Sequence, residues 1–385
     1  MANDAYNIVK YMRVVGMDVD LILNKQDFGM SFPQWEDGLF PGTVDPYEVD
    51  GGALATLASL PDWIRVWDQN RFGSGIIGRA AKRVDLFRLL KSYDIIEAHV
   101  PAAIYAQFLN VPYIVYDAGW IRCFPSSDQP WDKLARRGYM KACAVLVTNP
   151  DTFWIFDKLP FVTRTVFMPF VIDLDIYRPL RTTQRSQFEC DLLLFAPSRQ
   201  SWKEKGNEKL LLGYSKFLKG CNPHFRPLLV MVDWGPDAER SKTLAMDLTL
   251  SEHVQFIKPV HKRELVQYYN AADAILDQFT LGSYGTAAPE AMACEKPVIM
   301  YYSEKAFRRT FGELPPLLNA YNPEDIEKQL TQCVDHSFRK EIGKKSRQWV
   351  EKHHGWRLVV EKHRRLYSFA LGECGWEDVL NDHIH

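Results

Sequence analysis

The chemically richest stretch of the sequence runs from Ala274 to Tyr301 and reads AILDQFTLGSYGTAAPEAMACEKPVIMY. An apolar run ends near Asp277 and leads through the loop Gly282-Ser283-Tyr284-Gly285-Thr286 into a helical segment. Glycines let a backbone approach a ligand closely, and the free N–H groups at a helix start attract an anion. We expect a diphosphate there, with Glu290 accepting hydrogen bonds from ribose hydroxyls. The alternative is a tight turn and a surface glutamate, and this segment alone leaves both open.

The same segment resembles the signature of the retaining glycosyltransferases of family four, which have the GT-B fold. Their signature is a glutamate, seven residues, a second glutamate, and then Ala-Met-Ala-x-x-x-Pro-Val. Glu290-Ala291-Met292-Ala293 and Pro297-Val298 match it, and Tyr284-Gly285 takes the place of the usual Phe-Gly. Gly282 stands where the first glutamate, which commonly contacts the donor sugar, would be, and Glu295 replaces a usual glycine. The departure at Gly282 leaves the donor sugar open.

Two cations are the candidate catalytic pair. Phe195-Ala196-Pro197-Ser198-Arg199, followed by Lys205-Gly206-Asn207, resembles the Arg…Lys-Gly element that opens the second domain of this family. A sugar leaving a nucleotide deposits negative charge on the β-phosphate, and cations at that phosphate stabilise the transition state. We therefore expect Arg199 and Lys205 to hold the diphosphate. In isolation they would be solvated charges near a strand end.

Further segments extend the resemblance over roughly residues 90 to 360. Met231–Pro236 resembles the strand and glycine turn that follow the cations in the family. Val254–Val260 resembles the strand whose following backbone, here at Pro259, commonly holds the nucleobase. Pro169–Pro179 is similar to the crossing between the two domains. The resemblance implies a metal-independent retaining transferase without a cofactor, in which the acceptor hydroxyl attacks from the front face and its proton passes to the leaving phosphate.

The first half of the chain offers weaker candidates on the acceptor side. Asp94-Ile95-Ile96-Glu97-Ala98-His99 places His99 at the carboxyl end of an expected strand, where a histidine can bind a sugar or simply be hydrogen-bonded in the structure. Another expected strand leads into Asp117-Ala118-Gly119-Trp120, where many relatives have a His-Gly pair. Because Ala118 replaces that histidine, Asp117 or His99 would supply the polar contacts.

Several other patterns are better explained without a ligand. Gly73–Gly78 spells GxGxxG, but no convincing strand precedes it, as a dinucleotide fingerprint requires. Asp18-Val19-Asp20 and Asp173-Leu174-Asp175 have a spacing that can hold a divalent metal, although the second lies in the crossing between domains. His353-His354 lacks the cysteines or carboxylates of a metal site. We expect no metal site.

Short apolar runs that alternate with longer amphipathic segments must position these residues, and this rhythm is typical of parallel sheets covered by helices. The expected strands are Val19–Leu23, Ile95–His99, Tyr113–Tyr116, Val145–Thr148, Thr165–Met168, Leu192–Ala196, Leu228–Val232, Val254–Ile257, Ala274–Asp277 and Pro297–Met300. The fold class is therefore α/β, and the resemblance implies GT-B, with two Rossmann-like doubly wound domains facing across a cleft.

The domain boundaries follow from a polar segment near the middle of the chain. Residues 179–189 lack apolar periodicity and divide the chain nearly in half. We expect an acceptor-binding domain over 1–180, a nucleotide-sugar-binding domain over 181–356, and a helix in 357–385 that packs back on the first domain. A doubly wound domain normally opens with a strand, whereas this chain begins almost directly with a helix. Either the start of the chain is misplaced or the first domain is rearranged.

Bulk composition narrows the setting. With 46 % apolar residues, 25 % charged residues and a net charge of −1, the 385-residue chain is globular and does not have the charge of a nucleic-acid binder. Its seven cysteines are scattered, which is not typical of a disulfide framework. We also recognise no signal peptide and no membrane-spanning segment, and we therefore expect a cytoplasmic protein. The basic clusters Arg79–Arg83 and Arg136-Arg137 are solvated helix faces or a surface that docks on anionic lipid at the inner face of a membrane.

These observations predict a glycosyltransferase that moves a sugar from a nucleotide-diphosphate-sugar to a glycan or lipid-linked acceptor with retention of configuration. Two alternatives stay open. One is a sugar-nucleotide epimerase or phosphorylase on the same architecture. The other is a non-catalytic homologue that binds a nucleotide or glycan as a partner subunit, which Gly282 and Ala118 would suit.

Overall fold

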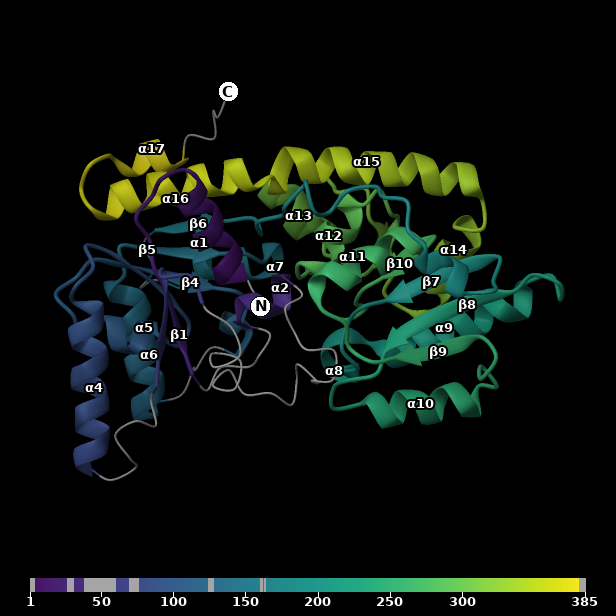
Figure 1. The fold of residues 1–385 in the computed structure, drawn as a ribbon, viewed down its shortest axis with the longest axis horizontal. Helices are drawn as coiled ribbons and strands as arrows, with labels where there is room; N and C mark the ends of the chain where they lie inside the picture. Colours follow the sequence, from purple (N-terminus) through teal and green to yellow (C-terminus); the bar gives the residue numbers. More distant parts are fainter. Residues whose placement is uncertain are drawn as a thin grey trace. The chain divides into compact units, whose positions relative to one another are not determined.

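The chain consists of two compact units, each built around parallel strands (Figure 1). The second unit contains Ile172–Gly355, together with α2 (Pro33–Asp37) from Gln34 onward. The first contains the chain up to Val171, apart from the segment that begins at Gln34, and resumes at Trp356. The computed structural model describes residues 4–25, 31–37, 60–68, 76–123, 128–159, 162 and 164–380.

The second unit holds a six-stranded sheet of parallel strands in the order β12-β11-β10-β7-β8-β9. Its strands are β7 (Leu192–Ala196), β8 (Pro227–Val232), β9 (Val254–Ile257), β10 (Ala274–Leu276), β11 (Val298–Met300) and β12 (Leu318–Asn319). Counted within the unit, this is the 3-2-1-4-5-6 order of a doubly wound sheet. The strand order reverses between β7 and β10, and that position is where open α/β sheets bind ligands.

Helices cover this sheet, and Figure 1 draws α15 above the strands and α10 below them. Besides α2, the described helices of the second unit are the 3₁₀ helix η4 (Gln184–Gln187) and the α-helices α8 (Trp202–Lys205), α9 (Asn207–Gly220), α10 (Ala238–Asp247), α11 (Lys262–Ala271), α12 (Ala287–Ala293), α13 (Glu304–Phe311), α14 (Pro323–Gln332) and α15 (His336–His354). Asn322 begins α14 with a capping box, because its side chain accepts from the Asp325 N–H and the Asp325 carboxylate accepts in return.

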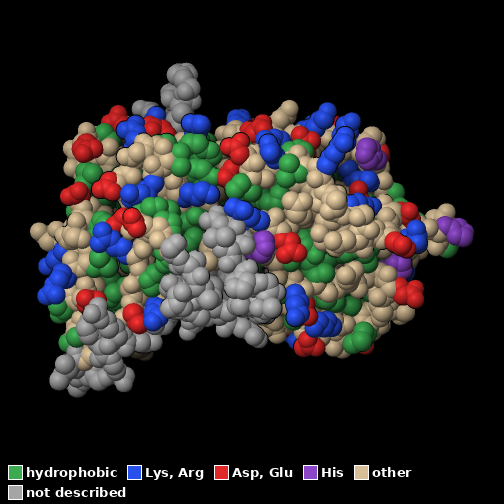
Figure 2. Space-filling model, viewed as in Figure 1, with side chains coloured by type: hydrophobic (Ala, Val, Ile, Leu, Met, Phe, Trp, Pro, Cys, Tyr) green, Lys and Arg blue, Asp and Glu red, His purple; other side chains and the backbone are tan. Residues whose placement is uncertain are grey.

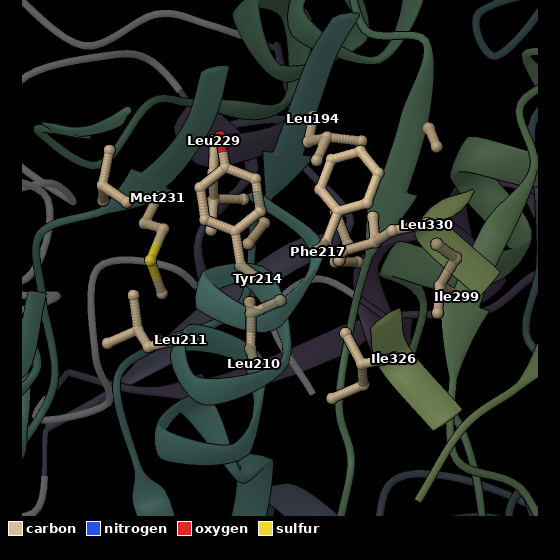
Figure 3. Close-up of a cluster of buried hydrophobic side chains, with 14 of the residues drawn as sticks. Leu194, Leu210, Leu211, Tyr214, Phe217, Leu229, Met231, Ile299, Ile326 and Leu330 are labelled. Atoms are coloured by element: carbon tan, nitrogen blue, oxygen red, sulfur yellow. The ribbon is translucent and has the colours of Figure 1, made fainter. Parts of the chain in front are cut away.

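The core of the second unit forms where α9 faces the sheet (Figure 3). Leu210, Leu211, Tyr214 and Phe217 follow one another at helical spacing, so they share one face of α9 and are all buried. They pack among strand residues such as Leu194, Leu229 and Met231 and residues of α14 such as Ile326 and Leu330. This core fixes the strands whose carboxyl ends carry the predicted site.

The first unit divides its strands between two parallel sheets. One sheet pairs β1 (Leu21–Asn24) with β2 (Ile64–Trp67). The other has the order β3-β4-β5-β6, with β3 (Ile96–His99), β4 (Tyr113–Asp117), β5 (Ala144–Val147) and β6 (Thr165–Phe167). Among the described residues no strand joins β1 to β3, although the Tyr93 hydroxyl before β3 donates to Asp20 before β1 over 2.7 Å.

Alternation along β4 gives the larger sheet of the first unit two buried faces. Ile114 and Tyr116 contribute to a core with α1 and α16, whereas Tyr113 and Val115 contribute to a core with α5 and α6. The helices are α1 (Asp4–Val14), α4 (Ile76–Leu90), α5 (Ala103–Ala106), α6 (Pro130–Lys141), α7 (Pro150–Phe153), α16 (Trp356–Ala370) and α17 (Trp376–Leu380), with 3₁₀ turns η2 (Trp120–Cys123) and η3 (Phe156–Lys158).

The α16 helix returns the end of the chain to the first unit. Val359, Val360 and Leu366 are buried in the core beside α1, and the Trp356 ring stacks on Tyr11 with centroids 4.8 Å apart. Because these apolar residues lie on one face of α16, their burial fixes the helix against the sheet.

The strand predictions are confirmed, with boundaries that move by at most two residues. Each expected strand has a counterpart; Val19–Leu23, for example, becomes β1 (Leu21–Asn24), because Asp20 turns to meet Arg65 and Tyr93. Gly73-Ser74-Gly75 lies outside the described residues. Lys, Arg, Asp and Glu side chains are interspersed over the face drawn in Figure 2, as the small net charge suggests. No helix in the described part of the chain could span a membrane.

Candidate functional site at the switch point of the second unit

The sequence-predicted cations lie at the carboxyl edge of the second unit's sheet, beside the switch point. Arg199 follows β7, and Lys205 ends the short helix α8 that comes next. Asp277 directly follows β10, the neighbour of β7 on the other side of the reversal. Parallel strands end at a common edge, so this topology brings residues about 80 positions apart in sequence into contact: the Ser198 hydroxyl donates to the Asp277 carboxylate.

The loop that carries Arg199 is shaped by a glycine. Gly235 follows β8 with φ +111°, in the left-handed region, and a Cβ added there would lie 2.5 Å from the Gln200 carbonyl oxygen. The close approach lets the Gln200 backbone both donate and accept: its N–H donates to the Trp234 carbonyl over 2.8 Å, and its carbonyl accepts from the Asp237 N–H over 3.0 Å. The Gln200 side-chain amide also donates to the Val232 carbonyl over 3.0 Å. The Gly235 turn therefore fixes the backbone next to Arg199.

A second glycine places Lys205. Gly206 ends α8 with φ +69°, and a Cβ there would lie 2.8 Å from Thr280 Oγ1. Because Gly206 allows this approach, the Phe279 N–H donates to the Lys205 carbonyl over 2.7 Å. The Lys-Gly pair noted in the sequence thus joins α8 to the segment that follows β10.

Each cation faces a carboxylate of the same unit. Arg199 forms an ion pair with Glu204, and both side chains are exposed, at 42 % and 47 %. Lys205 Nζ lies 3.9 Å from Asp277 Oδ1, and here the side chains are 22 % and 1 % exposed. The first pair is solvated and the second is largely buried, so the two cations have different surroundings.

Gln278 holds the glycine-containing loop in place. Its buried side-chain amide donates to the carbonyls of Leu281, Ser283 and Tyr301, and its carbonyl accepts from the Leu281 N–H over 2.8 Å. The loop after β10 is thus tied both to itself and to the residue after β11. A buried amide with this many partners is a rigid support for the residues on either side.

Glu290 lies inside the second unit with two partners that the sequence did not indicate. Lys262 donates to one carboxylate oxygen, and the Tyr269 hydroxyl donates to the other over 3.1 Å. Lys262 is itself buried and lies 3.5 Å from Thr286 Oγ1 at the start of α12. Lys262 begins α11 just after β9. Because residues that follow parallel strands gather at one edge of the sheet, its position in the sequence could have indicated that it belongs to the site. A carboxylate with two donors still has lone pairs for further hydroxyls.

The remaining predicted donor-side residues surround these groups in different ways. Tyr284 is buried, and its hydroxyl forms a 2.8 Å hydrogen bond with His354. Gly285 has open space where a side chain would be, whereas a Cβ on Gly282 would lie 3.1 Å from Ser303 Cβ. Ser283 is buried beside the Gln278 amide. Pro259, half-buried, follows β9 at the same edge.

The first unit contains the two acceptor-side candidates. His99 is partly exposed, stacks on the Tyr116 ring at a centroid distance of 4.0 Å, and pairs through Nε2 with Glu97 Oε1 over 3.1 Å. Asp117 is fully buried, and its carboxylate accepts from the Gly119 N–H and the Tyr139 hydroxyl, each over 2.6 Å. Burial raises the pKa of Asp117 despite these hydrogen bonds. Asp117 thus shapes its loop from within, while the His99 ring is within reach of a ligand.

The aspartate pairs with metal-like spacing have internal partners. Asp20 pairs with Arg65 over 2.7 Å, and Asp173 Oδ1 accepts the N–H groups of Asp175 and Ile176 as part of a turn. Across the residues that the structure describes, no group of three or more His, Cys, Asp or Glu side chains is arranged to hold a metal ion.

The sequence of residues 192–349 matches the profile of a known family, the glycosyl transferases group 1. The match covers most of the second unit and less than half of the whole chain. The match spans the strands β7 to β12 and contains Arg199, Lys205 and Glu290, so it covers the predicted donor-side residues. The resemblance inferred from the motifs is confirmed.

Individual relatives match over part of their length. The D-inositol 3-phosphate glycosyltransferase of Frankia alni is 32 % identical over 139 residues, which is 33 % of this chain and 34 % of the relative. That of Acidothermus cellulolyticus is 26 % identical over 224 residues, covering 54 % and 49 %. The chain therefore spans between a third and a half of the length of these relatives.

Solved structures resemble the chain over most of its length. A sucrose-phosphate synthase from Thermosynechococcus elongatus has a TM-score of 0.70 at 17 % identity, covering 95 % of this chain and 92 % of that one. Anabaena HepE, solved in complex with UDP and glucose, has a TM-score of 0.68 at 16 % identity, covering 91 % and 100 %. At this identity the likeness shows the fold, and it confirms the predicted GT-B class with two Rossmann-like units.

Proposed function

We propose that the protein transfers a sugar from a nucleotide-diphosphate-sugar to a hydroxyl acceptor with retention of anomeric configuration, without a metal ion. The observation that carries the proposal is the placement of Arg199 and Lys205 beside the switch point of a group 1 glycosyltransferase unit. Two cations at one edge suit an anion with more than one charge, and a diphosphate is such an anion.

The chain's residues have separable roles in this reaction. Arg199 and Lys205 would bind the two phosphates and stabilise the charge that develops when the sugar–oxygen bond breaks. Backbone N–H groups at Tyr284, Gly285 and Thr286 would assist them, and Glu290, fixed by Lys262 and Tyr269, would accept the ribose hydroxyls. The acceptor hydroxyl would bond to the anomeric carbon from the face that the phosphate leaves. Its proton would pass to the departing phosphate oxygen.

Donor choice is tested by product release. HepE was solved with UDP and with UDP-glucose, so UDP-sugars are the first donors to assay, followed by GDP- and ADP-sugars. We expect one donor class to give acceptor-dependent release of the free nucleoside diphosphate, undiminished by EDTA. Release that stops in EDTA and returns with Mg²⁺ would contradict the metal-independent mechanism.

Retention is tested on the product. With an α-linked donor, proton NMR of the first-formed glycoside should show the small anomeric coupling of an α linkage. A β product would refute retention while leaving transferase activity intact. A change in the donor's sugar with no acceptor consumed would instead favour an epimerase.

We further propose that the acceptor is lipid-linked and that α6 rests on an anionic membrane surface. The side chains of Trp131 and Met140 are 48 % and 57 % exposed on α6, and Lys133, Arg137 and Lys141 are exposed on the same helix. Aromatic and basic side chains together favour the headgroup region of anionic bilayers. Co-sedimentation with phosphatidylglycerol vesicles, lost in Trp131→Ser with Arg137→Glu, supports the proposal. Equal sedimentation with neutral vesicles, or none, overturns it.

A further inference from the structure

Asp277 is a buried carboxylate with one nearby cation. Its side chain is 1 % exposed, the Ser198 hydroxyl donates to Oδ1, and Lys205 Nζ lies 3.9 Å from the same oxygen. Within the described part of the chain, Oδ2 is buried without a hydrogen-bond partner. Burying a charge this incompletely satisfied is costly, and the cost rises sharply if its one counter-charge is removed. We therefore expect the Lys205 ammonium to remain beside Asp277.

The other cation of the site is held far less firmly. The Arg199–Glu204 pair is exposed on both sides, and exposed ion pairs contribute little free energy because solvent screens them. An arriving diphosphate can draw Arg199 away from Glu204, since water solvates the carboxylate that is left. The same exchange at Lys205 would strand Asp277 in the interior.

Lys205 is also fixed through its main chain by the same segment. The Phe279 N–H donates to the Lys205 carbonyl over 2.7 Å, and Gly206 packs against Thr280. The segment that follows β10 thus contacts Lys205 at two points: Phe279 binds its backbone carbonyl, and Asp277 lies beside its ammonium group. Arg199 pairs instead with Glu204 of α8, and its side chain is 42 % exposed.

We propose that Asp277 is a positioning residue for sugar transfer: it holds the Lys205 ammonium in place while a bound diphosphate occupies the ammonium's outer side. Glu204, by contrast, is a placeholder that Arg199 exchanges for phosphate. This inference rests on the proposed function, because it assigns the second role to the same two cations. No covalent step is added, since Asp277 acts only through Lys205.

The two carboxylates should therefore respond in opposite ways to neutralisation. Asp277→Asn keeps an oxygen for the Ser198 hydroxyl but removes the charge that fixes Lys205, and misplacing a catalytic group lowers rates by on the order of tenfold to a hundredfold. We expect kcat to fall by that factor, while the Kd for the nucleoside diphosphate stays equal or decreases, because a nearby negative charge is lost. Glu204→Gln should lower the donor KM about threefold with kcat unchanged, because the diphosphate then no longer competes with the Glu204 carboxylate for Arg199.

The experiment measures kcat, donor KM and nucleoside diphosphate Kd for these variants beside Glu239→Gln. Glu239 pairs with Lys242 on α10, is exposed, and lies outside the site, so this control should match the wild type. A double-mutant cycle separates positioning from structure: in a Lys205→Met background, Asp277→Asn should cost no further kcat. If Asp277→Asn does not fold, Ser198→Ala removes only the hydroxyl that fixes the carboxylate and should lower kcat in the same direction.

The outcomes are distinguishable. An Asp277→Asn protein with wild-type kcat, or one whose kcat falls equally with and without Lys205, overturns the inference and leaves the proposed function standing. A simultaneous loss of kcat, binding and melting temperature also overturns it, because that pattern marks a structural role; we expect it for Gln278→Ala. A wild-type protein that neither binds nor releases a nucleoside diphosphate contradicts the proposed function and the inference with it.

Discussion

At the residue scale, chemical type and spacing in the sequence indicated Arg199, Lys205 and Glu290 as site residues. The structure adds the side chains with which each of them interacts. The partners of these residues come from distant segments: Asp277 reaches Lys205 across the switch point, and Lys262 reaches Glu290 from the start of α11. Such pairs depend on which strands are neighbours, and a local pattern carries no information about strand order. Gly206 and Gly235 differ from these pairs, because the need for glycine there comes from the local backbone, whose φ angle is positive at both positions.

One residue departs from the family pattern at a visible structural cost. Glu295 replaces a usual glycine and has φ 57°, in the left-handed region that disfavours a side chain. The turn is forced into this conformation because Gly343 of α15 packs directly against the Glu295 carbonyl. Glu295→Gly should therefore raise the free energy of unfolding by about 0.5 to 1 kcal/mol, after the extra flexibility of glycine in the unfolded chain is counted.

Urea denaturation checks this expectation, with Lys328→Gly in the exposed face of α14 as the matched control. Lys328 has ordinary helical geometry, so glycine there should lower the free energy of unfolding by about 1 kcal/mol. Destabilisation of similar size by both substitutions would show that Glu295 is not strained.

At the element scale, amphipathic periodicity predicted most helices and strands. Which helices pack together and which strands are neighbours depends on tertiary contacts that periodicity does not show. The α9 helix, for example, follows from its apolar face, but its close approach to α14 depends on Gly213, which has no periodic signature. Strand order in the first unit was also beyond the sequence. The division into a two-stranded and a four-stranded sheet needed the structure.

The α9–α14 contact gives a direct test of this packing. A Cβ on Gly213 would lie 2.7 Å from Ile326 Cβ and 2.9 Å from the Pro323 carbonyl oxygen. Gly213→Ala should therefore lower the free energy of unfolding by about 1 to 3 kcal/mol through overpacking. Gly220→Ala, at the end of the same helix with open space around it, is the control and should be neutral or slightly stabilising. Equal effects at both positions would refute the close contact.

A buried cluster joins β3 to α16 and should make the first unit acid-sensitive. Burial lowers the pKa of His363 below its ordinary 6.5, even though Glu97 lies 3.4 Å away. Burial acts to raise the pKa of Glu97, but His363, His99 and Tyr367 outweigh it and hold that pKa below 4.5. Both shifts mean that the unfolded chain binds protons more readily, so stability falls as the pH decreases, first below 6.5 for His363 and then below 4.5 for Glu97.

Urea unfolding at pH 7.5, 6 and 5 measures the contribution of His363. We expect the free energy of unfolding to fall by about 1 to 2 kcal/mol over this range, and much of that slope to disappear in His363→Leu. His224→Gln, in an exposed loop of the second unit, should keep the wild-type slope. An unchanged slope in His363→Leu would place the acid sensitivity elsewhere.

At the scale of the whole molecule, the sequence was most informative over the second unit, where residues 192–349 match the family. Fold class could be predicted throughout, since apolar alternation and helix spacing are present in both halves. Acceptor-side residues could not, because the motif position of a usual histidine is held by Ala118, and Asp117 is used to hold its own loop together. The donor side is thus the part of the site for which the sequence and the structure support the most specific claim.

That claim is tested most directly by calorimetric titration of UDP, GDP and ADP into the full chain in EDTA. We expect one of them to bind without metal. Arg199→Ala and Lys205→Ala should each weaken binding at least tenfold, because each removes a charge-assisted contact of about 1.5 kcal/mol or more. Lys242→Ala should leave binding unchanged. Binding of no nucleoside diphosphate by folded protein, or binding indifferent to both cations, would contradict that claim.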